Sequence, residues 1–226
     1  MSLLMTELEV RLPNRKPTSS FSTGKKPMAE VSCIMENGRS REIVVPVRVA
    51  KQLMQDLIPL PLDEEDAFDA IHAIEARCCF ALLVEMLNRR DYATGEARSK
   101  LASYGFRDIE IDQAIARALD ARFLDDARFA SQFIDERKRR GWGRRRIEAE
   151  LTRRGVDPSE LPGYPVEFFS DDDDFERAQD ILRRKTIPET KAYEKLVRHL
   201  MAKGFPYSVA SAAVKARLSS EDCLGF

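Results

Sequence analysis

The residues of this chain with the clearest chemical potential are cations gathered around its single tryptophan. Between positions 136 and 154 there are nine lysines or arginines against three acids, although the whole chain has a formal net charge of −1. Like charges packed this closely repel one another, so they require full solvation or an anionic partner. The candidate binding residues are Arg137, Lys138, Arg139, Arg140, Trp142, Arg144, Arg145, Arg146, Arg153 and Arg154.

Two interpretations of this basic segment stay open. In the functional one, the cations contact acidic protein or DNA phosphate, and Trp142 is an exposed anchor of the kind found at interfaces. Arginine at a helix start is opposed by the helix dipole, so Arg144 to Arg146 cost stability unless an anion binds there. In the structural one, the segment is a solvated turn and Trp142 belongs to the core.

The other polar residues do not form a recognisable catalytic set. Four consecutive aspartates, Asp171 to Asp174, converge poorly as metal ligands, and a solvated linker, an N-cap cluster or a contact with a basic partner explains them better. The two histidines, His72 and His199, lie in amphipathic segments, and phosphate-loop and metalloprotease motifs are missing. We therefore expect a protein that is not an enzyme and uses neither a cofactor nor a metal.

Cysteine usage and hydropathy indicate the compartment. The four cysteines have no CxxC spacing, which favours reduced thiols in a cytoplasmic protein. No stretch approaches 18 consecutive apolar residues, and the amino terminus lacks the apolar core of a secretory signal. We expect a soluble cytoplasmic protein without membrane contact.

These residues lie within a pattern that occurs three times. An apolar residue stands four positions before a glycine, and a second apolar residue follows that glycine. The copies are Leu101–Phe106, Leu151–Val156 and Leu200–Phe205, and their glycines are 50 and 49 residues apart. Each copy is typical of an amphipathic helix that ends at a left-handed glycine. A constant period indicates tandem helical units.

The expected fold class is all-α, with three tandem three-helix repeats in an elongated, curved array preceded by a small β-hairpin. The hairpin is indicated by Asn37-Gly38 between two β-prone runs. The third helix of repeat two is cut short by Pro162, Gly163 and Pro165. The expected parts are a disordered arm (1–28), the hairpin with a short helix (29–62), repeat one (63–122), repeat two with a truncated third helix (123–168), and an acidic linker with repeat three (169–226).

Repeat two opens with a helix-start motif. Asp125 is placed to act as N-cap, and Asp126 favours the positive end of the helix. The motif, to which we assign a structural role, comprises Leu124, Asp125, Asp126, Ala127, Arg128, Phe129 and Ala130.

This motif and the following segment 139–157 closely resemble the RecX family of bacterial regulatory proteins. The segments Leu87–Tyr92 and Lys100–Phe106 resemble the family's first repeat, and Lys195–Phe205 resembles its last. The resemblance covers about residues 66 to 218. It implies a regulator that binds the RecA nucleoprotein filament and lies in its groove. It also implies inhibition or modulation of the ATPase, recombinase and co-protease activities of RecA in DNA repair and the SOS response.

The alternative is a helical-repeat protein that binds duplex or single-stranded DNA directly. A basic stripe across all three repeats would favour this alternative, whereas a patch confined to repeat two favours the filament. Repeat one contributes little net positive charge. We therefore expect a monomer whose partner is the RecA filament, with DNA bound weakly or as part of that filament.

Overall fold

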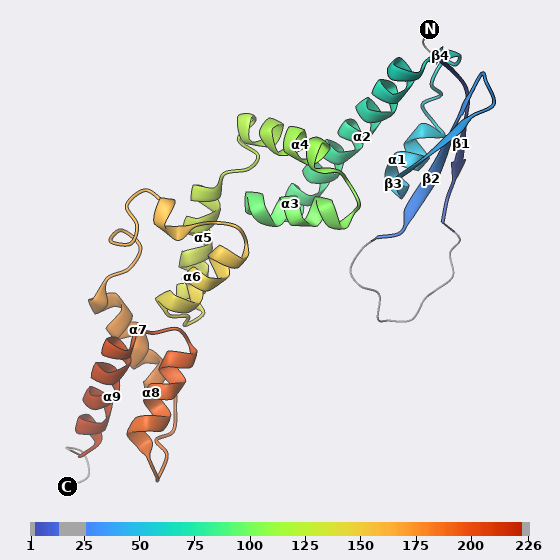
Figure 1. The fold of residues 1–226 in the computed structure, drawn as a ribbon. Helices are drawn as coiled ribbons and strands as arrows, with labels where there is room; N and C mark the ends of the chain where they lie inside the picture. Colours follow the sequence, from blue (N-terminus) through green and yellow to red (C-terminus); the bar gives the residue numbers. More distant parts are fainter. Residues whose placement is uncertain (1–2, 14–25, 223–226) are drawn as a thin grey trace. The chain divides into compact units, whose positions relative to one another are not determined.

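The computed structural model describes residues 3–13 and 26–222 and divides into two compact units, Met1–Leu124 and Asp125–Phe226 (Figure 1). Within the described residues the chain forms nine α-helices, one 3-10 helix and four β-strands. The prediction of a mainly helical protein is confirmed. None of these helices is long and apolar enough to cross a membrane.

The first unit contains more β-structure than the predicted hairpin. Its four strands form an antiparallel sheet in the order β3-β2-β1-β4. They are β1 (Leu4–Arg11), β2 (Met28–Met35), β3 (Ser40–Pro46) and β4 (Leu62–Asp63). The predicted hairpin is formed by β2 and β3, with Gly38 at a φ of 80° in the turn between them.

The prediction of a disordered arm over residues 1–28 is wrong for β1. This strand pairs with β2 from Met5 to Arg11, with an irregularity between Met5 and Glu7. That irregularity interrupts the alternation of apolar and polar residues by which a strand is recognised in a sequence. Residues 14–25 of the predicted arm lie outside the described residues.

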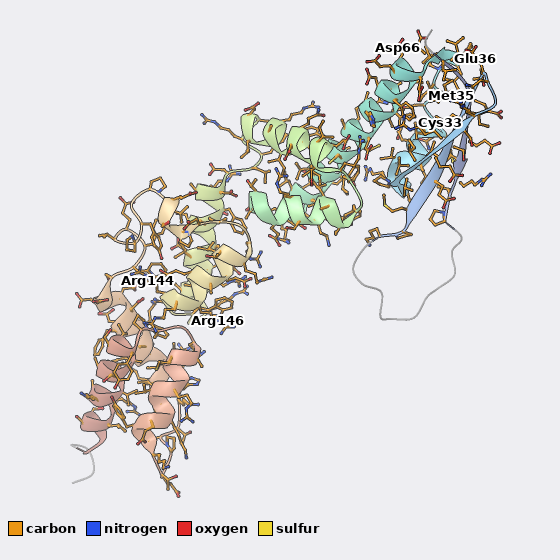
Figure 2. All side chains as sticks on the ribbon, viewed as in Figure 1. Cys33, Met35, Glu36, Asp66, Arg144 and Arg146 are labelled. Carbon is orange, nitrogen blue, oxygen red and sulfur yellow. The ribbon has the colours of Figure 1, made fainter. Side chains whose placement is uncertain are left out.

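The core of the first unit lies between the sheet and the helices. Helices α1 (Val47–Leu53) and α2 (Glu64–Leu87) contribute to one hydrophobic cluster with the strands. Cys33 and Met35, labelled on β2 in Figure 2, are both buried in it. Helices α3 (Thr94–Ser103) and α4 (Asp108–Asp120) pack against α2 and complete the three helices predicted for repeat one.

Two buried carboxylates lie between α2 and α4. Glu75 and Glu110 are each 3% exposed, and the guanidinium of Arg107 forms ion pairs with both. Arg107 Nη2 also lies 2.6 Å from His72 Nδ1. His72, Glu75 and Glu110 are close enough together to be potential metal ligands, and the guanidinium of Arg107 contacts all three. Desolvation by burial, with a smaller contribution from Glu110, raises the pKa of Glu75 to about 7 in spite of Arg107.

The raised pKa of Glu75 gives the first unit a predicted pH dependence. Because the folded-state pKa lies above the unfolded value, the stability contribution is complete below pH 4.5 and is lost as the pH rises through 7. Glu75→Gln removes the charge. We therefore expect the free energy of unfolding of the variant to be about 1–3 kcal/mol higher than that of the parent near pH 8. The two should be equal near pH 4.

Urea unfolding followed by circular dichroism across this pH range measures the difference. Glu65→Gln on the exposed face of the same helix is the matched control and should change little at any pH. A Glu75→Gln variant that is less stable than the parent near pH 8 would show that the ion pair with Arg107 outweighs the burial of Glu75.

The second unit contains the helices predicted for repeats two and three. They are α5 (Asp126–Arg139), α6 (Arg144–Arg153), the 3-10 helix η1 (Pro158–Glu160), α7 (Asp171–Arg183), α8 (Ala192–Ala202) and α9 (Tyr207–Asp222). The stunted third helix of repeat two corresponds to η1. Gly105, Gly155 and Gly204 all have a positive φ, as the repeated helix ending requires.

The acidic run is part of a helix, and its prediction as a linker is wrong. Asp171 to Asp174 form the first turn of α7, and the hydroxyl of Ser170 accepts a hydrogen bond from the backbone N–H of Asp173. Carboxylates in a first turn are stabilised by the positive end of the helix dipole, which explains the run without a metal ion. The N-cap interpretation of these aspartates is therefore confirmed.

Candidate functional site

The helix-start motif positions the first helix of the basic segment. Asp125 Oδ1 accepts a hydrogen bond of 2.9 Å from the backbone N–H of Arg128, which confirms the predicted cap. Phe129 and Ala130 are buried along α5, whereas Ala127 and Arg128 are exposed. Leu124 is buried too, but it belongs to the hydrophobic cluster of the first unit. The capped, half-buried helix carries Arg137 to Arg140 in and after its last turn.

The turn that follows α5 ends that helix with backbone hydrogen bonds. Gly141, with a φ of 76°, donates to the carbonyl of Lys138 at 2.9 Å. Trp142 donates to the carbonyl of Arg137 at 3.0 Å. This is the pattern of a helix C-terminus closed by a left-handed glycine, and it fixes where Trp142 and α6 start.

The start of α6 is held by the third repeat. Gly143 N–H donates to the carbonyl of Lys203 at 2.8 Å, and Arg145 N–H donates to the carbonyl of Gly204 at 3.0 Å. Two backbone donors at this helix start are therefore occupied by carbonyls of the turn between α8 and α9. The backbone at this helix start is capped from within the unit, and the expectation that an anion binds the side chains of Arg144 to Arg146 stays a prediction.

The two turns approach each other so closely that a side chain on Gly143 would not fit. A Cβ built on Gly143 would lie 2.3 Å from the carbonyl carbon of Gly204 and from the nitrogen of Phe205. The backbone of Gly143 is extended, with a φ of −84°, so space and not conformation requires glycine here. The close approach joins repeats two and three at one contact, which we call the interlocked turns (residues 141–145 and 203–205).

Several of the predicted binding residues are used inside the unit. The guanidinium of Arg137 lies 4.6 Å from the ring centre of Phe133 and 5.0 Å from that of Trp142, and its side chain is 16% exposed. Lys138 Nζ donates to the carbonyl of Phe168 at 2.9 Å and pairs with Asp173 at 2.8 Å. These two cations stabilise the packing of α5 against its neighbours.

Arg144 and Arg154 are also engaged. Arg144 pairs with Glu148 at 2.7 Å and lies over the rings of Tyr164 and Phe169. Arg154 pairs with Glu150, whose pKa falls to about 2 because the side chains of Arg153 and Arg154 donate hydrogen bonds to its carboxylate. Burial raises the pKa of Tyr164 to about 12, and its hydrogen bond to Glu148 adds to this shift. A partner would have to break these contacts to use the same charges.

The remaining cations of the segment are exposed. Arg140 and Arg153 are more than half exposed and pair with acids of their own helices, Glu136 and Glu150. For Arg139, Arg145 and Arg146, which are also exposed, the described part of the chain provides no ion pair. The guanidinium of Arg146 lies 3.8 Å from the ring centre of Trp142, which is half-buried. We call Arg139, Arg145 and Arg146 the exposed basic face; Figure 2 labels Arg146 near the start of α6.

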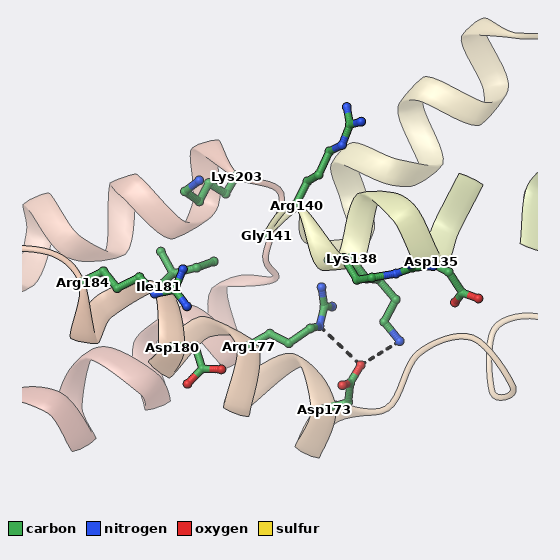
Figure 3. Close-up of a pocket in the computed structure, with 11 residues that line it drawn as sticks. Asp135, Lys138, Arg140, Gly141, Asp173, Arg177, Asp180, Ile181, Arg184 and Lys203 are labelled. Atoms are coloured by element: carbon green, nitrogen blue, oxygen red, sulfur yellow. Dashed lines mark ion pairs between the residues drawn. The ribbon is translucent and has the colours of Figure 1, made fainter. Parts of the chain in front are cut away.

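The structure adds residues of the third repeat that the sequence analysis did not assign. Arg177 donates to the carbonyl of Trp142 at 2.8 Å and pairs with Asp174, which is 2% exposed. Figure 3 shows Arg177 and Lys138 pairing with the same carboxylate, that of Asp173. Only the third Leu-x-x-x-Gly copy, at Gly204, hinted that the segment around Lys203 is a tight turn.

A groove of about 680 Å³ lies beside these ion pairs. It is bounded by the end of α5, by one side of α7 and by the residue that caps α8 (Figure 3). Six of its lining residues are cations: Lys138, Arg139, Arg140, Arg177, Arg184 and Lys203. The arrangement offers no nucleophile paired with a base, so its chemistry is the binding of anionic groups.

Comparison with known proteins places the basic segment in a described domain. A family model described as RecX, second three-helix domain, matches residues 125–160. The regulatory protein RecX of Vibrio vulnificus is 32% identical over 133 residues, which cover 57% of this chain and 86% of that protein. The regulatory protein RecX of Thermus thermophilus is 36% identical over 146 residues, which cover 65% of this chain and 95% of that protein.

Solved structures show the same fold. The crystal structure of RecX from Lactobacillus salivarius matches with a TM-score of 0.55 and 17% identity, over 64% of this chain and 97% of that one. A second crystal structure, described as regulatory protein RecX, matches with a TM-score of 0.54 and 16% identity, over 92% of this chain and 97% of that one. At these identities the structures support the fold alone.

Proposed function

The chain belongs to the RecX family of regulatory proteins, and we propose that it acts by binding the RecA nucleoprotein filament and inhibiting or modulating its ATPase, recombinase and co-protease activities. These activities serve DNA repair and the SOS response. The observation that carries the proposal is the exposed basic face, at the end of α5 and the start of α6. Arg139, Arg145 and Arg146 are exposed cations on a rigid, internally capped support.

The support matters because it lowers the cost of binding. The interlocked turns fix the backbone of Arg145, and the ring of Trp142 positions the guanidinium of Arg146. Side chains that are ordered before association lose less entropy when a partner arrives. Charges at the rim of an interface also speed association and select an acidic partner surface.

The charge distribution favours a protein filament over naked DNA as the main partner. Acidic side chains outnumber basic ones in the helices of the first unit, so the exposed cations do not continue as a stripe through α2, α3 and α4. Non-specific DNA binding draws its affinity from several phosphate contacts along a track. In this proposal DNA is contacted weakly or as part of the filament, and the protein acts as a monomer in the cytoplasm.

The proposal is tested by titrating the protein into a RecA ATPase assay on single-stranded DNA. We expect inhibition at stoichiometric levels. Arg145→Ala with Arg146→Ala should raise the half-inhibitory concentration about tenfold to a hundredfold, because each exposed charged contact contributes about 1 kcal/mol or more. Arg198→Ala, an exposed residue of α8, is the matched control and should inhibit like the parent.

Two outcomes separate the parts of the proposal. If the parent protein leaves RecA ATPase unchanged at stoichiometric levels, the proposed function is wrong. If the double variant inhibits as well as the parent, the basic face is not the contact. Binding to naked DNA that is tight and falls steeply with salt would favour the direct DNA-binding alternative.

A further inference from the structure

The groove beside the interlocked turns is lined by cations of two kinds, those in ion pairs that stabilise the unit and those without an ion-pair partner among the described residues. Asp173 is occupied by Lys138 and Arg177, so this triad holds α5 to α7. Arg184 and Lys203 also line the groove, and the described residues provide no ion-pair partner for either. They are the residues that cap α7 and α8.

Helix dipoles account for part of this pattern. A basic residue near the C-terminus of a helix is favourable, and Arg139, Arg184 and Lys203 each lie at such an end. The dipole effect explains each cation separately. It does not explain why three helix ends line the same groove, around an apolar side chain.

That side chain is Ile181, which lines the groove from α7 and is half-buried. Gly141 lies against it, and a Cβ on Gly141 would come within 3.3 Å of Ile181 Cδ1. Figure 3 shows Ile181 and Gly141 with Arg140, Arg184 and Lys203 around the cavity. The groove therefore combines an apolar surface with cations that have unused donors.

This combination fits a peptide better than a nucleic acid. Asp135 and Asp180 also line the groove, so its cations do not form the continuous track that the regularly spaced phosphates of a nucleic acid require, whereas a peptide needs carboxylates only beside the cations. No aromatic ring is among the lining residues, whereas sites for single-stranded nucleic acid stack bases on aromatic rings. A polypeptide can place carboxylates beside the cations and an apolar side chain on Ile181.

We propose that this groove binds an acidic segment of a partner protein, with one apolar side chain of the segment on Ile181 and flanking carboxylates on Arg184 and Lys203. The proposal deepens the proposed function and rests on it for the identity of the partner. The exposed basic face and the groove, which share Arg139, then contact the same acidic protein surface.

The test uses the full chain and a fluorescein-labelled peptide, Asp-Glu-Leu-Glu-Asp, in an anisotropy titration. Arg184→Glu with Lys203→Glu should weaken peptide binding at least about tenfold, because two charged hydrogen bonds become repulsions. Arg198→Glu, a charge reversal at an exposed residue of α8 outside the groove lining, is the matched control and should bind within about twofold of the parent.

A second variant addresses the apolar contact and guards against misfolding. Ile181→Ser should weaken binding of the leucine peptide and leave binding of a serine-substituted peptide, Asp-Glu-Ser-Glu-Asp, unchanged. Fluorescence of Trp142, the only tryptophan, reports whether the neighbouring turns stay folded in each variant. If the charge-reversed pair does not fold, Arg184→Gln alone replaces it and should show a smaller loss in the same direction.

Three results would overturn the proposal. The first is that the parent does not bind the leucine peptide. The second is that Arg198→Glu weakens binding as much as the groove variants do. The third is that an oligothymidylate displaces the peptide and binds more tightly, which would make the groove a nucleic-acid site. If the protein binds the peptide but does not inhibit RecA, only the proposed function is contradicted. If the protein inhibits RecA but does not bind the peptide, only the proposal that the groove binds an acidic segment is contradicted.

Discussion

Replacement of Gly143 by alanine is expected to destabilise the second unit by about 3 kcal/mol. The added Cβ would lie 2.3 Å from backbone atoms of Gly204 and Phe205, and backbone cannot move aside as the end of a side chain can. Overpacking alone costs about 1–3 kcal/mol. Opening the contact would also lengthen the hydrogen bonds from Gly143 to Lys203 and from Arg145 to Gly204, each worth about 1 kcal/mol.

Urea unfolding followed by Trp142 fluorescence measures this loss at the site itself, because the only tryptophan lies in the interlocked turns. Two glycines separate the causes. Gly38→Ala lies in the first unit, so its unfolding is followed by circular dichroism. Its Cβ meets no atom within 4 Å but needs a φ of 80°, so only the left-handed conformation costs energy, about 1 kcal/mol. Gly204→Ala combines a φ of 98° with close contacts to Arg146 and should cost at least as much as Gly143→Ala.

The expected order of cost is therefore Gly204→Ala, then Gly143→Ala, then Gly38→Ala. A Gly143→Ala protein as stable as the parent would mean that repeats two and three are not held by this contact. In that case the cations of the third repeat would not be held at the groove. The same variant should also weaken binding of the acidic peptide, since Lys203 belongs to the displaced turn.

Replacement of Arg177 by methionine is expected to cost the second unit about 3 kcal/mol at neutral pH. Asp174 is 2% exposed and pairs with Arg177, so the variant leaves a buried carboxylate without its main partner. It also removes the donor to the carbonyl of Trp142. Methionine keeps the apolar volume of the side chain, so the loss reports charge and hydrogen bonding.

The loss should depend on pH in a defined direction. Burial already raises the pKa of Asp174, and Arg177 opposes this shift, so removing Arg177 raises the pKa further. A carboxyl whose folded pKa is raised is penalised only when ionised, so the loss grows as the pH rises above the unfolded value of 3.8. Near pH 4 the variant and the parent should approach each other.

Unfolding free energies from urea titrations near pH 4.5 and pH 7.5 measure this dependence. Arg183→Met, an exposed residue of the same helix paired with Asp180, is the control and should cost less than about 1 kcal/mol. Adding Asp174→Asn to Arg177→Met should recover part of the stability at pH 7.5. A loss that is the same at both pH values would show that packing, not the charge of Asp174, is what Arg177 supplies.

Much of the helical part of the fold was predictable because its determinants are local. In all three copies of the repeated pattern the glycine ends a helix, and Gly105, Gly155 and Gly204 all adopt the left-handed conformation. Asp125 caps α5 through atoms three residues apart. The errors have local causes too: the irregularity after Met5 hid β1, and the run Asp171 to Asp174 has the polarity of a linker although it forms the first turn of α7.

The basic segment shows where local information ends. The sequence identified the concentration of cations around Trp142, and ten residues there stay a proposed binding set. It did not separate Arg137 and Lys138, which stabilise the unit, from Arg145 and Arg146, which remain exposed. Charge is a property of the residue, but its availability depends on partners such as Phe133 and Asp173.

The sequence alone determined the helix ends, the cap at Asp125, the family resemblance and the density of positive charge, because each depends on residues that are close together in the chain. The tertiary structure alone decided which cations face solvent and which residues of the third repeat join them. The physical reason is the contact of Gly143 with Gly204, about 60 residues apart in the chain. Such a contact depends on how two helical units pack, and no local propensity encodes it.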